Sequence, residues 1–322
     1  MAATITAAMV KQLREMTSVG MSDCKKALVE ADGDFDRAVE LLREKGLAMA
    51  AKKAGRIASE GLSAAYITDD NTKGVLVEVN SETDFVAKNQ DFQSYVAQVA
   101  RQAAQSSAAA LEDFLQEKWI ADESVTVQEA LTQKIAVISE RLDIRRFERF
   151  ERQGQGALVS YVHGGGRVAV LLELASEAES GALTEAGKNI CMQIAAMSPR
   201  FVSRADISEE FLEKEKEILT QQSINEEQEK ARENPGYKAK PPQVLEKIIA
   251  GRLEKEIKDF CLLTQEYVKD SELTVGGYLE SVSKKIGPTI TVKRFARYAT
   301  GEGLAKKEEN FAEEVNKAMG QS

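Results

Sequence analysis

The sequence predicts an α+β protein in which helices cover two small, related sheets. Two β-hairpin patterns are present, each with turn residues between two partly alternating runs. A helical pattern follows each hairpin, so one order of elements occurs twice and indicates two similar lobes. In the first copy, strands are predicted at 61–68 and 73–80 and a helix at 90–104. In the second copy, strands are predicted at 157–162 and 167–175 and a helix at 183–197.

The composition is that of a globular chain with several folding units. The length of 322 residues favours two or three folding units. The hydrophobic content of 43% and the charged content of 30% are those of an ordinary globular protein. A net charge of −9 argues against direct nucleic-acid binding, which needs a basic surface. No apolar run approaches a membrane span, and the N-terminus lacks the pattern of a secretory signal. The three cysteines are far apart, which suits a reducing compartment. We therefore expect a cytoplasmic protein that does not bind membranes.

Residues 4–46 predict a compact unit of three helices. An apolar stripe runs along the first, and Val19-Gly20-Met21 forms the turn to the second. The predicted N-caps are Thr6 for the first helix, Ser22 or Asp23 for the second, and Asp34 for the third, and the predicted stop is Gly46. Residues 47–56 are rich in alanine and lysine and predict a helical linker.

The remaining segments complete the two lobes and add a long insertion. Further strands are expected at 144–150 and 289–298. The charged, periodic segment 208–263, broken by prolines, predicts an antiparallel helical hairpin, and 304–319 predicts a short C-terminal helix. The resulting domains are 1–54, 55–150, 151–205 with 262–303, the hairpin 206–261, and a C-terminal module 304–322.

Motifs that resemble enzyme sites are incomplete. His163-Gly164-Gly165-Gly166 resembles an esterase oxyanion loop, but the chain has no G-x-S-x-G, and its one histidine already lies in this loop. The run Gly181–Lys188 has the wrong spacing for a phosphate-binding P-loop. Neither an HExxH nor an EF-hand pattern is present. We predict that the protein is not an enzyme and needs no cofactor or metal.

The segment Asn80–Asn89, after the first hairpin, contains an aromatic residue in polar surroundings. Phe85 lies just before a predicted helix, whereas the corresponding loop, 176–181, has no aromatic residue. An aromatic ring on an exposed loop is a candidate binding anchor. The alternative is that Phe85 folds under the helix and joins a small satellite core.

Several motifs resemble the elongation factor Ts family. The hallmark T-D-F-V-A-K-N is present as Thr83–Asn89, and Leu13–Leu28 is similar to the N-terminal helical domain of that family. Ser160–Gly164 and Gly301–Gly303 also match, in the same order. The resemblance covers essentially the whole chain. The glycine run after His163 and the proline-containing segment 225–242 depart from the family pattern.

The resemblance implies a guanine-nucleotide exchange factor that acts in translation elongation. Its partner would be the GTPase elongation factor Tu, and its N-terminal helices would resemble a ubiquitin-associated (UBA) domain. The implied contact residues near the magnesium of the partner are Thr83, Asp84, Phe85 and Val86, with Ala87, Lys88 and Asn89 supporting the loop. Further implied contacts are Val19, Met21 and Lys25 in the N-terminal helices and His163 in the second lobe.

Three other functions remain as alternatives. The N-terminal helices alone would suit a ubiquitin-binding or other adaptor. The glycine run would suit a hydrolase, although its catalytic residues are incomplete. A structural protein that binds the ribosome is disfavoured by the acidic charge. The helical hairpin predicts either a homodimer contact or a brace for the second lobe.

Overall fold

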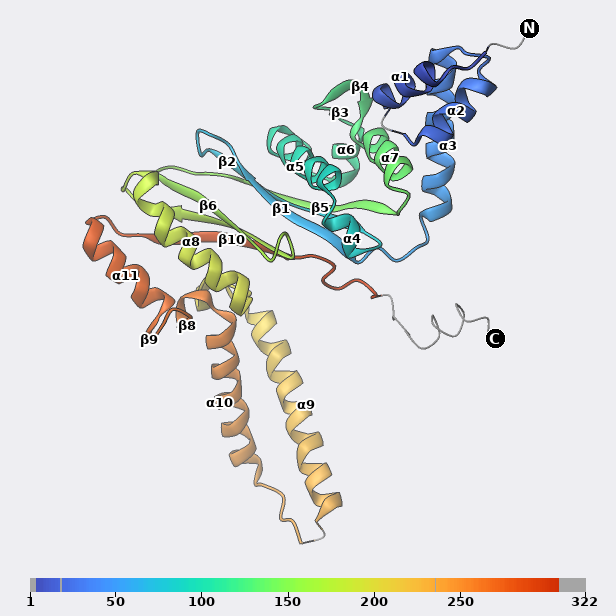
Figure 1. Cartoon of the computed structure of the whole chain (residues 1–322). Coiled ribbons are helices and arrows are strands. Elements are labelled where there is room, and N and C mark those ends of the chain that lie inside the picture. The colour runs from blue at the N-terminus through green and yellow to red at the C-terminus, as the bar shows by residue number, and fades with distance from the viewer. Residues whose placement is uncertain (1–3, 18, 235, 307–322) are drawn as a thin grey trace.

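The computed structural model describes residues 4–17, 19–234 and 236–306. The fold is α+β, as the sequence predicts: two three-stranded antiparallel sheets lie at the centre, with helices around them. Three N-terminal helices lie at one end of the molecule, and a long helical pair projects from the other (Figure 1). No described helix is long and apolar enough to cross a membrane.

The N-terminal helices are α1 (Ala7–Thr17), α2 (Met21–Glu30) and α3 (Phe35–Lys53). Two predicted caps are confirmed: the Thr6 hydroxyl accepts from the Met9 amide, and the Asp34 carboxylate accepts from the Arg37 amide. The cap predicted for α2 is wrong. Gly20 is the N-cap, so Ser22 and Asp23 both lie inside the first turn, where they cannot be the flanking residue.

The predicted end of the third helix at Gly46 is also wrong, because α3 continues to Lys53. Gly46 is buried, and a Cβ atom at this position would lie 3.5 Å from the Cβ of Ala136 in α7 (Val127–Ile138). This distance is an ordinary van der Waals contact, so Gly46 lies on the face of α3 that packs on α7 and does not end the helix. The third helix and the predicted linker helix are one continuous helix.

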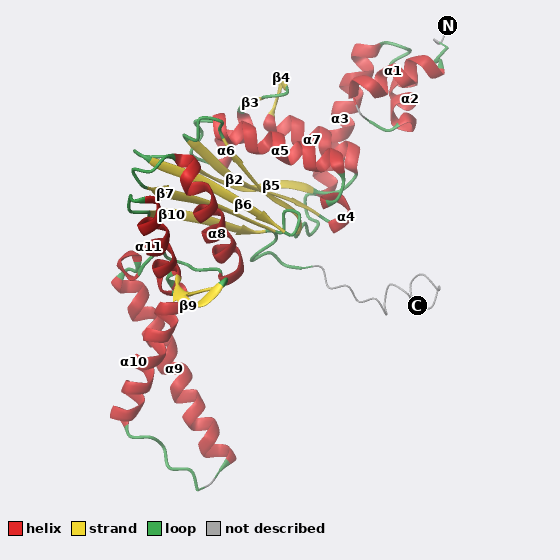
Figure 2. Ribbon diagram, turned by 60° about the vertical axis from the view of Figure 1, so that its left-hand side comes forward, coloured by secondary structure: helices red, strands yellow, loops and turns green. Residues whose placement is uncertain are grey.

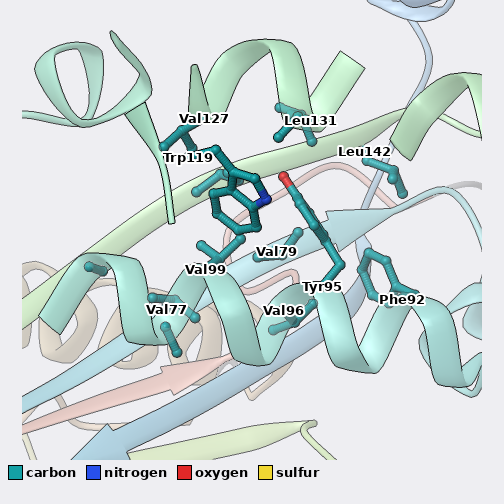
Figure 3. Close-up of a cluster of buried hydrophobic side chains, with 14 of the residues drawn as sticks. Val77, Val79, Phe92, Tyr95, Val96, Val99, Trp119, Val127, Leu131 and Leu142 are labelled. Carbon is teal, nitrogen blue, oxygen red and sulfur yellow. The ribbon is translucent and has the colours of Figure 1, made fainter. Parts of the chain in front are cut away.

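The first sheet has the order β1-β2-β5, from β1 (Glu60–Ile67), β2 (Lys73–Ser81) and β5 (Leu142–Glu151). The helices with this sheet are α4 (Asp84–Ala87), α5 (Gln90–Gln105), α6 (Leu111–Gln116) and α7. A two-stranded ladder, β3 (Lys118–Trp119) with β4 (Asp122–Thr126), precedes α7. We call this set the first lobe. Figure 3 shows its core, where the rings of Tyr95 and Trp119 meet between α5 and the ladder, with centroids 5.7 Å apart.

The second sheet has the order β10-β7-β6, from β6 (Gly156–His163), β7 (Val168–Ala175) and β10 (Thr291–Ala299). Its helices are α8 (Ser180–Met197) and α11 (Val275–Ile286), and its ladder is β8 (Glu266–Tyr267) with β9 (Asp270–Thr274). We call this set the second lobe. Short 3₁₀ turns lie at Arg204–Asp206 and Leu262–Thr264. Between them, α9 (Glu209–Glu233) and α10 (Pro242–Phe260) form the projecting pair (Figure 2).

The two sheets are joined through their hairpin turns. At one end, the side chain of Asn71 in the β1–β2 turn bonds to both the amide and the carbonyl of Leu158 in β6, at 2.8 and 2.9 Å. At the other end, the carbonyl of Gly166 in the β6–β7 turn accepts from the Ser63 amide in β1 at 2.7 Å. Each hairpin turn therefore lies on the first strand of the other sheet.

This crossing determines where the candidate site residues lie. The β6–β7 turn, which follows His163, rests on β1 near Glu60, and Glu60 pairs with Ser81 at the end of β2. The segment that resembles the family hallmark begins just beyond Ser81. Two loops that are far apart in the sequence therefore lie at one edge of the molecule.

Two predictions on architecture remain untested. The helix predicted at 304–319 lies mostly outside the described residues. The proposed domain boundaries also stay predictions, although the elements on which they depend are present.

Candidate functional site

The candidate loop lies between the end of β2 and the start of α5, and it contains the single turn α4. Thr83 fixes its first end: the Glu140 carboxylate accepts from the Thr83 amide at 3.0 Å and from its hydroxyl at 2.7 Å. The Ser81 hydroxyl also donates to the Thr83 carbonyl at 2.9 Å. Three hydrogen bonds therefore hold the chain just before α4.

Asn89 fixes the second end of the loop. Its side-chain oxygen accepts from the amides of Asp91 and Phe92, so it caps α5. Between the two ends, Val86 is buried in the core of the first lobe, and Ala87 packs against the same core. The supporting part of the hallmark segment thus anchors a short turn from both sides and from below.

Phe85 points away from this anchored turn. Its side chain is 79% exposed, more than any other large hydrophobic side chain in the described part of the chain. The alternative that Phe85 joins a satellite core is therefore wrong. Lys88 lies with its ammonium 5.7 Å from the ring centroid. An exposed aromatic ring on a rigid turn loses little conformational entropy when a partner covers it.

Asp84 lies beside Phe85 and pairs with Lys88. The Lys88 Nζ donates to the Asp84 carboxylate at 2.6 Å, and both side chains are largely open to solvent. This hydrogen bond, together with the charges of Lys88 and Arg167, holds the pKa of Asp84 below its ordinary value. Asp84 therefore stays ionised at neutral pH and presents a carboxylate next to the ring.

The β6–β7 turn brings His163 and Arg167 to the same edge. His163 is exposed, and its Nδ1 lies 2.9 Å from the Tyr161 hydroxyl. The three glycines after it all have positive φ angles, which glycine adopts without strain. The glycine run thus forms the hairpin turn, and the positive charge of Arg167 reaches Asp84 across the boundary between the lobes.

The predicted N-terminal contacts lie on a different part of the molecule. Met21 and Lys25 are exposed and one helical turn apart, so they share a face of α2. Val19 is half-buried and lines a cleft of about 190 Å³ between the N-terminal helices and α7. In Figures 1 and 2, α2 lies above α7, whereas α4 lies at the sheet edge.

The residues that hold the loop in place were not predicted. Besides Glu140, the Glu82 carboxylate accepts from the Arg141 amide at 2.6 Å and from Arg56 at 3.3 Å. These contacts join segments more than 20 residues apart, so no local pattern could have shown them. The described residues contain no cluster of three or more side chains suited to a metal ion.

Comparison with known proteins gives one consistent result. The profile of the family described as "Elongation factor TS" matches residues 82–302. Elongation factor Ts of Clostridium perfringens (strain SM101 / Type A) is 50% identical over 316 residues, which is 98% of this chain and 99% of that protein. The Clostridium novyi (strain NT) protein of the same name is 49% identical, and that of Clostridioides difficile (strain 630) 48%, each over 317 residues with the same coverage.

Proposed function

The chain belongs to the elongation factor Ts family, and from this premise we propose that it binds the GTPase elongation factor Tu and promotes the release of GDP. The role of the family in translation elongation also supports a location in the cytoplasm. The observation that carries the proposal is the exposed ring of Phe85 on a turn held at both ends. The function is that of a binding protein that speeds the release of GDP from its partner, not that of an enzyme.

The proposed mechanism is a wedge. A GTPase holds GDP through a magnesium ion and through backbone amides that surround the phosphates. Phe85, supported from below by Val86, would enter between the elements that carry these groups and displace them without touching the nucleotide. The ionised Asp84 carboxylate would approach the magnesium region and weaken its coordination shell.

Coupling between the two sites must be reciprocal. If this protein weakens GDP binding by a given factor, GDP weakens the complex by the same factor. One aromatic anchor contributes about 2 to 4 kcal/mol to an interface. Additional contacts are therefore needed for a stable complex. We assign them to His163 on the second lobe and to Met21 and Lys25 on α2, because all three side chains are exposed.

The test is release of a fluorescent GDP analogue from elongation factor Tu, followed by stopped flow. We expect Phe85→Ala to slow the stimulated release about 30-fold, which corresponds to the lower end of the energy of one anchor. The fold should stay intact because the ring makes no core contact. Val268→Ala is the matched control, since Val268 is also an exposed apolar side chain but lies in the β8–β9 turn. Equal rates for Phe85→Ala and the wild type would refute the wedge.

A magnesium titration separates the role of Asp84 from that of Phe85. Asp84→Asn removes the charge and keeps the size of the side chain. We expect the variant to slow release several-fold at high magnesium and less at low magnesium, because the carboxylate acts on the ion. Identical magnesium sensitivity in the variant and the wild type would exclude that role.

We also propose that the pair α9–α10 mediates self-association. Ile218 and Ile224 in α9 and Val244 in α10 are all more than a third exposed, although the helices pack on each other. The two helices bury few apolar side chains of their own, namely Leu219, Ile249 and Ile257, so contact with a second copy would cover the exposed ones. Sedimentation should show a dimer that Ile218→Ser with Ile224→Ser converts to a monomer. A wild-type chain that stays monomeric at high concentration would contradict this.

A further inference from the structure

We propose that Thr300 is a positioning residue that holds the His163 turn and the Phe85 loop in one fixed arrangement. This inference rests on the proposed function, because it concerns the two loops assigned to the partner. Thr300 follows β10 in the second lobe. Among the described residues, it forms no hydrogen bond with Phe85 or with His163. It acts through the backbone that carries them.

The Thr300 hydroxyl lies at the junction of three segments. It donates to the Gly166 carbonyl at 2.8 Å, and it lies 2.8 Å from the Ser63 hydroxyl. The same Gly166 carbonyl accepts from the Ser63 amide, and the Thr300 amide donates to the Arg167 carbonyl at 2.9 Å. One side chain thus links the turn after His163 to β1, which pairs with the strand that leads into α4.

The residue after Thr300 secures this junction in the first lobe. The Gly301 amide donates to the Glu78 carboxylate at 2.7 Å, and Glu78 is fully buried in β2. A Cβ atom at Gly301 would lie 2.0 Å from the Ser59 carbonyl oxygen, and its φ of +75° suits glycine. The backbone of the second lobe is therefore held directly against the first, within a few residues of Thr300.

The opposite end of the lobe boundary provides an internal comparison. There the Asn71 side chain makes two hydrogen bonds to the backbone of β6, but no candidate contact residue lies in that turn. Both ends join the same two lobes with similar numbers of bonds. Only the Thr300 end carries the Phe85 loop and the His163 turn.

This arrangement matters because both loops must engage one rigid partner at the same time. A misplacement of about 1 Å between two contact groups is enough to weaken a process that needs both. Each loop can still bind when the link is loosened, so affinity should change little. What should fall is the rate of GDP release from the complex, which needs both loops in place together.

The experiment compares Thr300→Val with Thr300→Ser in the full chain, using release of a fluorescent GDP analogue from elongation factor Tu. Valine has the shape of threonine but cannot bond to Gly166 or Ser63, whereas serine keeps the hydroxyl. Of the two lost bonds, only the one to the Ser63 hydroxyl crosses between the lobes. We expect Thr300→Val to lower the limiting release rate about fivefold, the effect of this one hydrogen bond, with the half-saturating concentration within about twofold of the wild type. Thr300→Ser should release GDP at the wild-type limiting rate, because it keeps the hydroxyl.

Asn71→Gly is the matched control for a purely structural effect. Asn71 has a φ of +55°, which glycine tolerates, so the variant deletes only the side-chain bonds at the other end of the boundary. We expect similar falls in the unfolding midpoint for Thr300→Val and Asn71→Gly, but a slower limiting rate for Thr300→Val alone. In a Phe85→Ala background, Thr300→Val should have little further effect.

The outcomes separate the inference from the proposed function. If the wild type accelerates release and Thr300→Val matches it, the positioning role is wrong and the proposed function stands. If Thr300→Val and Asn71→Gly slow release equally, the effect is general loosening of the lobes, and the positioning role is again wrong. If the wild type does not accelerate release, both the proposed function and the positioning role fail.

Discussion

The loops that leave β2 and β7 occupy equivalent places in the two lobes, but only the first presents an aromatic ring to solvent. Asn80 in β2 pairs with Gly61, and Ala175 in β7 pairs with Gly156. Phe85 follows Asn80 by five residues, and Ser180 follows Ala175 by the same number. The first loop forms the one-turn helix α4, whereas the second leads directly into α8. The sheet, its helices and its two-stranded ladder, which we call the frame, are therefore similar in the two lobes, and they support two different loops.

The frame itself is closely matched. Gln102 in α5 donates to the Lys118 carbonyl and accepts from the Ile120 amide, which fixes the β3–β4 ladder. Gln193 in α8 makes the same pair of bonds to the Glu266 carbonyl and the Val268 amide. The correspondence shows that buried polar contacts are kept in both lobes.

The lobes also contact each other in a reciprocal way. Arg146 of the first lobe stacks on Tyr298 of the second, with 4.1 Å from the guanidinium carbon to the ring centroid. Arg294 of the second lobe stacks on Phe150 of the first at 4.2 Å. Packing and buried polar contacts thus constrain the frame in both lobes, whereas the loop after the second strand of each hairpin differs and carries the exposed ring in the first lobe only.

The largest expected effect concerns the buried carboxylates of the frame. Glu78 is fully buried and bonded to Arg145 and Arg146, and Glu173 is buried and bonded to Arg294. Removing one partner of a buried ion pair costs about 3 to 5 kcal/mol. We expect Glu78→Ala to reach this range in urea denaturation, and Glu173→Ala to cost less, because the side chain of Arg294 is 44% exposed and can be hydrated. Equal losses of unfolding free energy in the two variants would show that the exposure of Arg294 does not reduce the cost.

A smaller effect is expected at the matched glutamines. Gln102→Ala and Gln193→Ala each leave backbone groups of a ladder without a partner, which costs about 2 to 3 kcal/mol. Because the bonds are the same in both lobes, the two variants should lower the free energy of unfolding by similar amounts. Chemical denaturation of both variants measures this. The contribution of one hydrogen bond varies by about 0.5 kcal/mol between sites. If the unfolding free energies of the two variants fall by amounts that differ by more than about 1 kcal/mol, the two ladders contribute unequally to stability.

The smallest effect is expected at Lys88. Without the Lys88 hydrogen bond, the pKa of Asp84 should rise toward its ordinary value. A carboxyl group whose pKa is lowered in the fold contributes stability above its ordinary pKa and loses it as the pH falls through the lowered value. Both values lie well below neutral, so Asp84 stays ionised in Lys88→Met at pH 7. We expect less than about a twofold change in GDP release at pH 7, and a larger difference from the wild type only near pH 4.

Much of the frame could be predicted from the sequence. Alternating runs around turn residues identified the four strands of the two hairpins, and the further strands expected at 144–150 and 289–298 are present as β5 and β10. Helical periodicity identified α5, α8 and the projecting pair. The segments 111–138 and 266–286 were missed. Their ladders begin with strands of two residues, too short for a periodic signal, and their helices have at most 12 residues. Their similarity was available: Trp119, Asp122 and Thr126 have the same spacing as Tyr267, Asp270 and Thr274.

The site was predictable only in part. Phe85 was predicted as a contact residue because an aromatic side chain in a polar loop is a candidate binding anchor. The partners that hold the loop, Glu140 above all, come from distant segments, and the sequence carries no local sign of them. The proximity of His163 depends on the crossing of the two sheets, which is a tertiary feature.

A site-specific cross-link shows directly whether Phe85 reaches the nucleotide-binding region of the partner. A photoreactive benzoylphenylalanine is placed at Phe85 or, as the control from the equivalent loop, at Ser180, and each protein is irradiated with elongation factor Tu carrying GDP. We expect a cross-link to the GTPase from position 85, within the nucleotide-binding region, and none from position 180. A complex that forms without any cross-link from position 85, or with equal yields from both positions, would contradict this expectation.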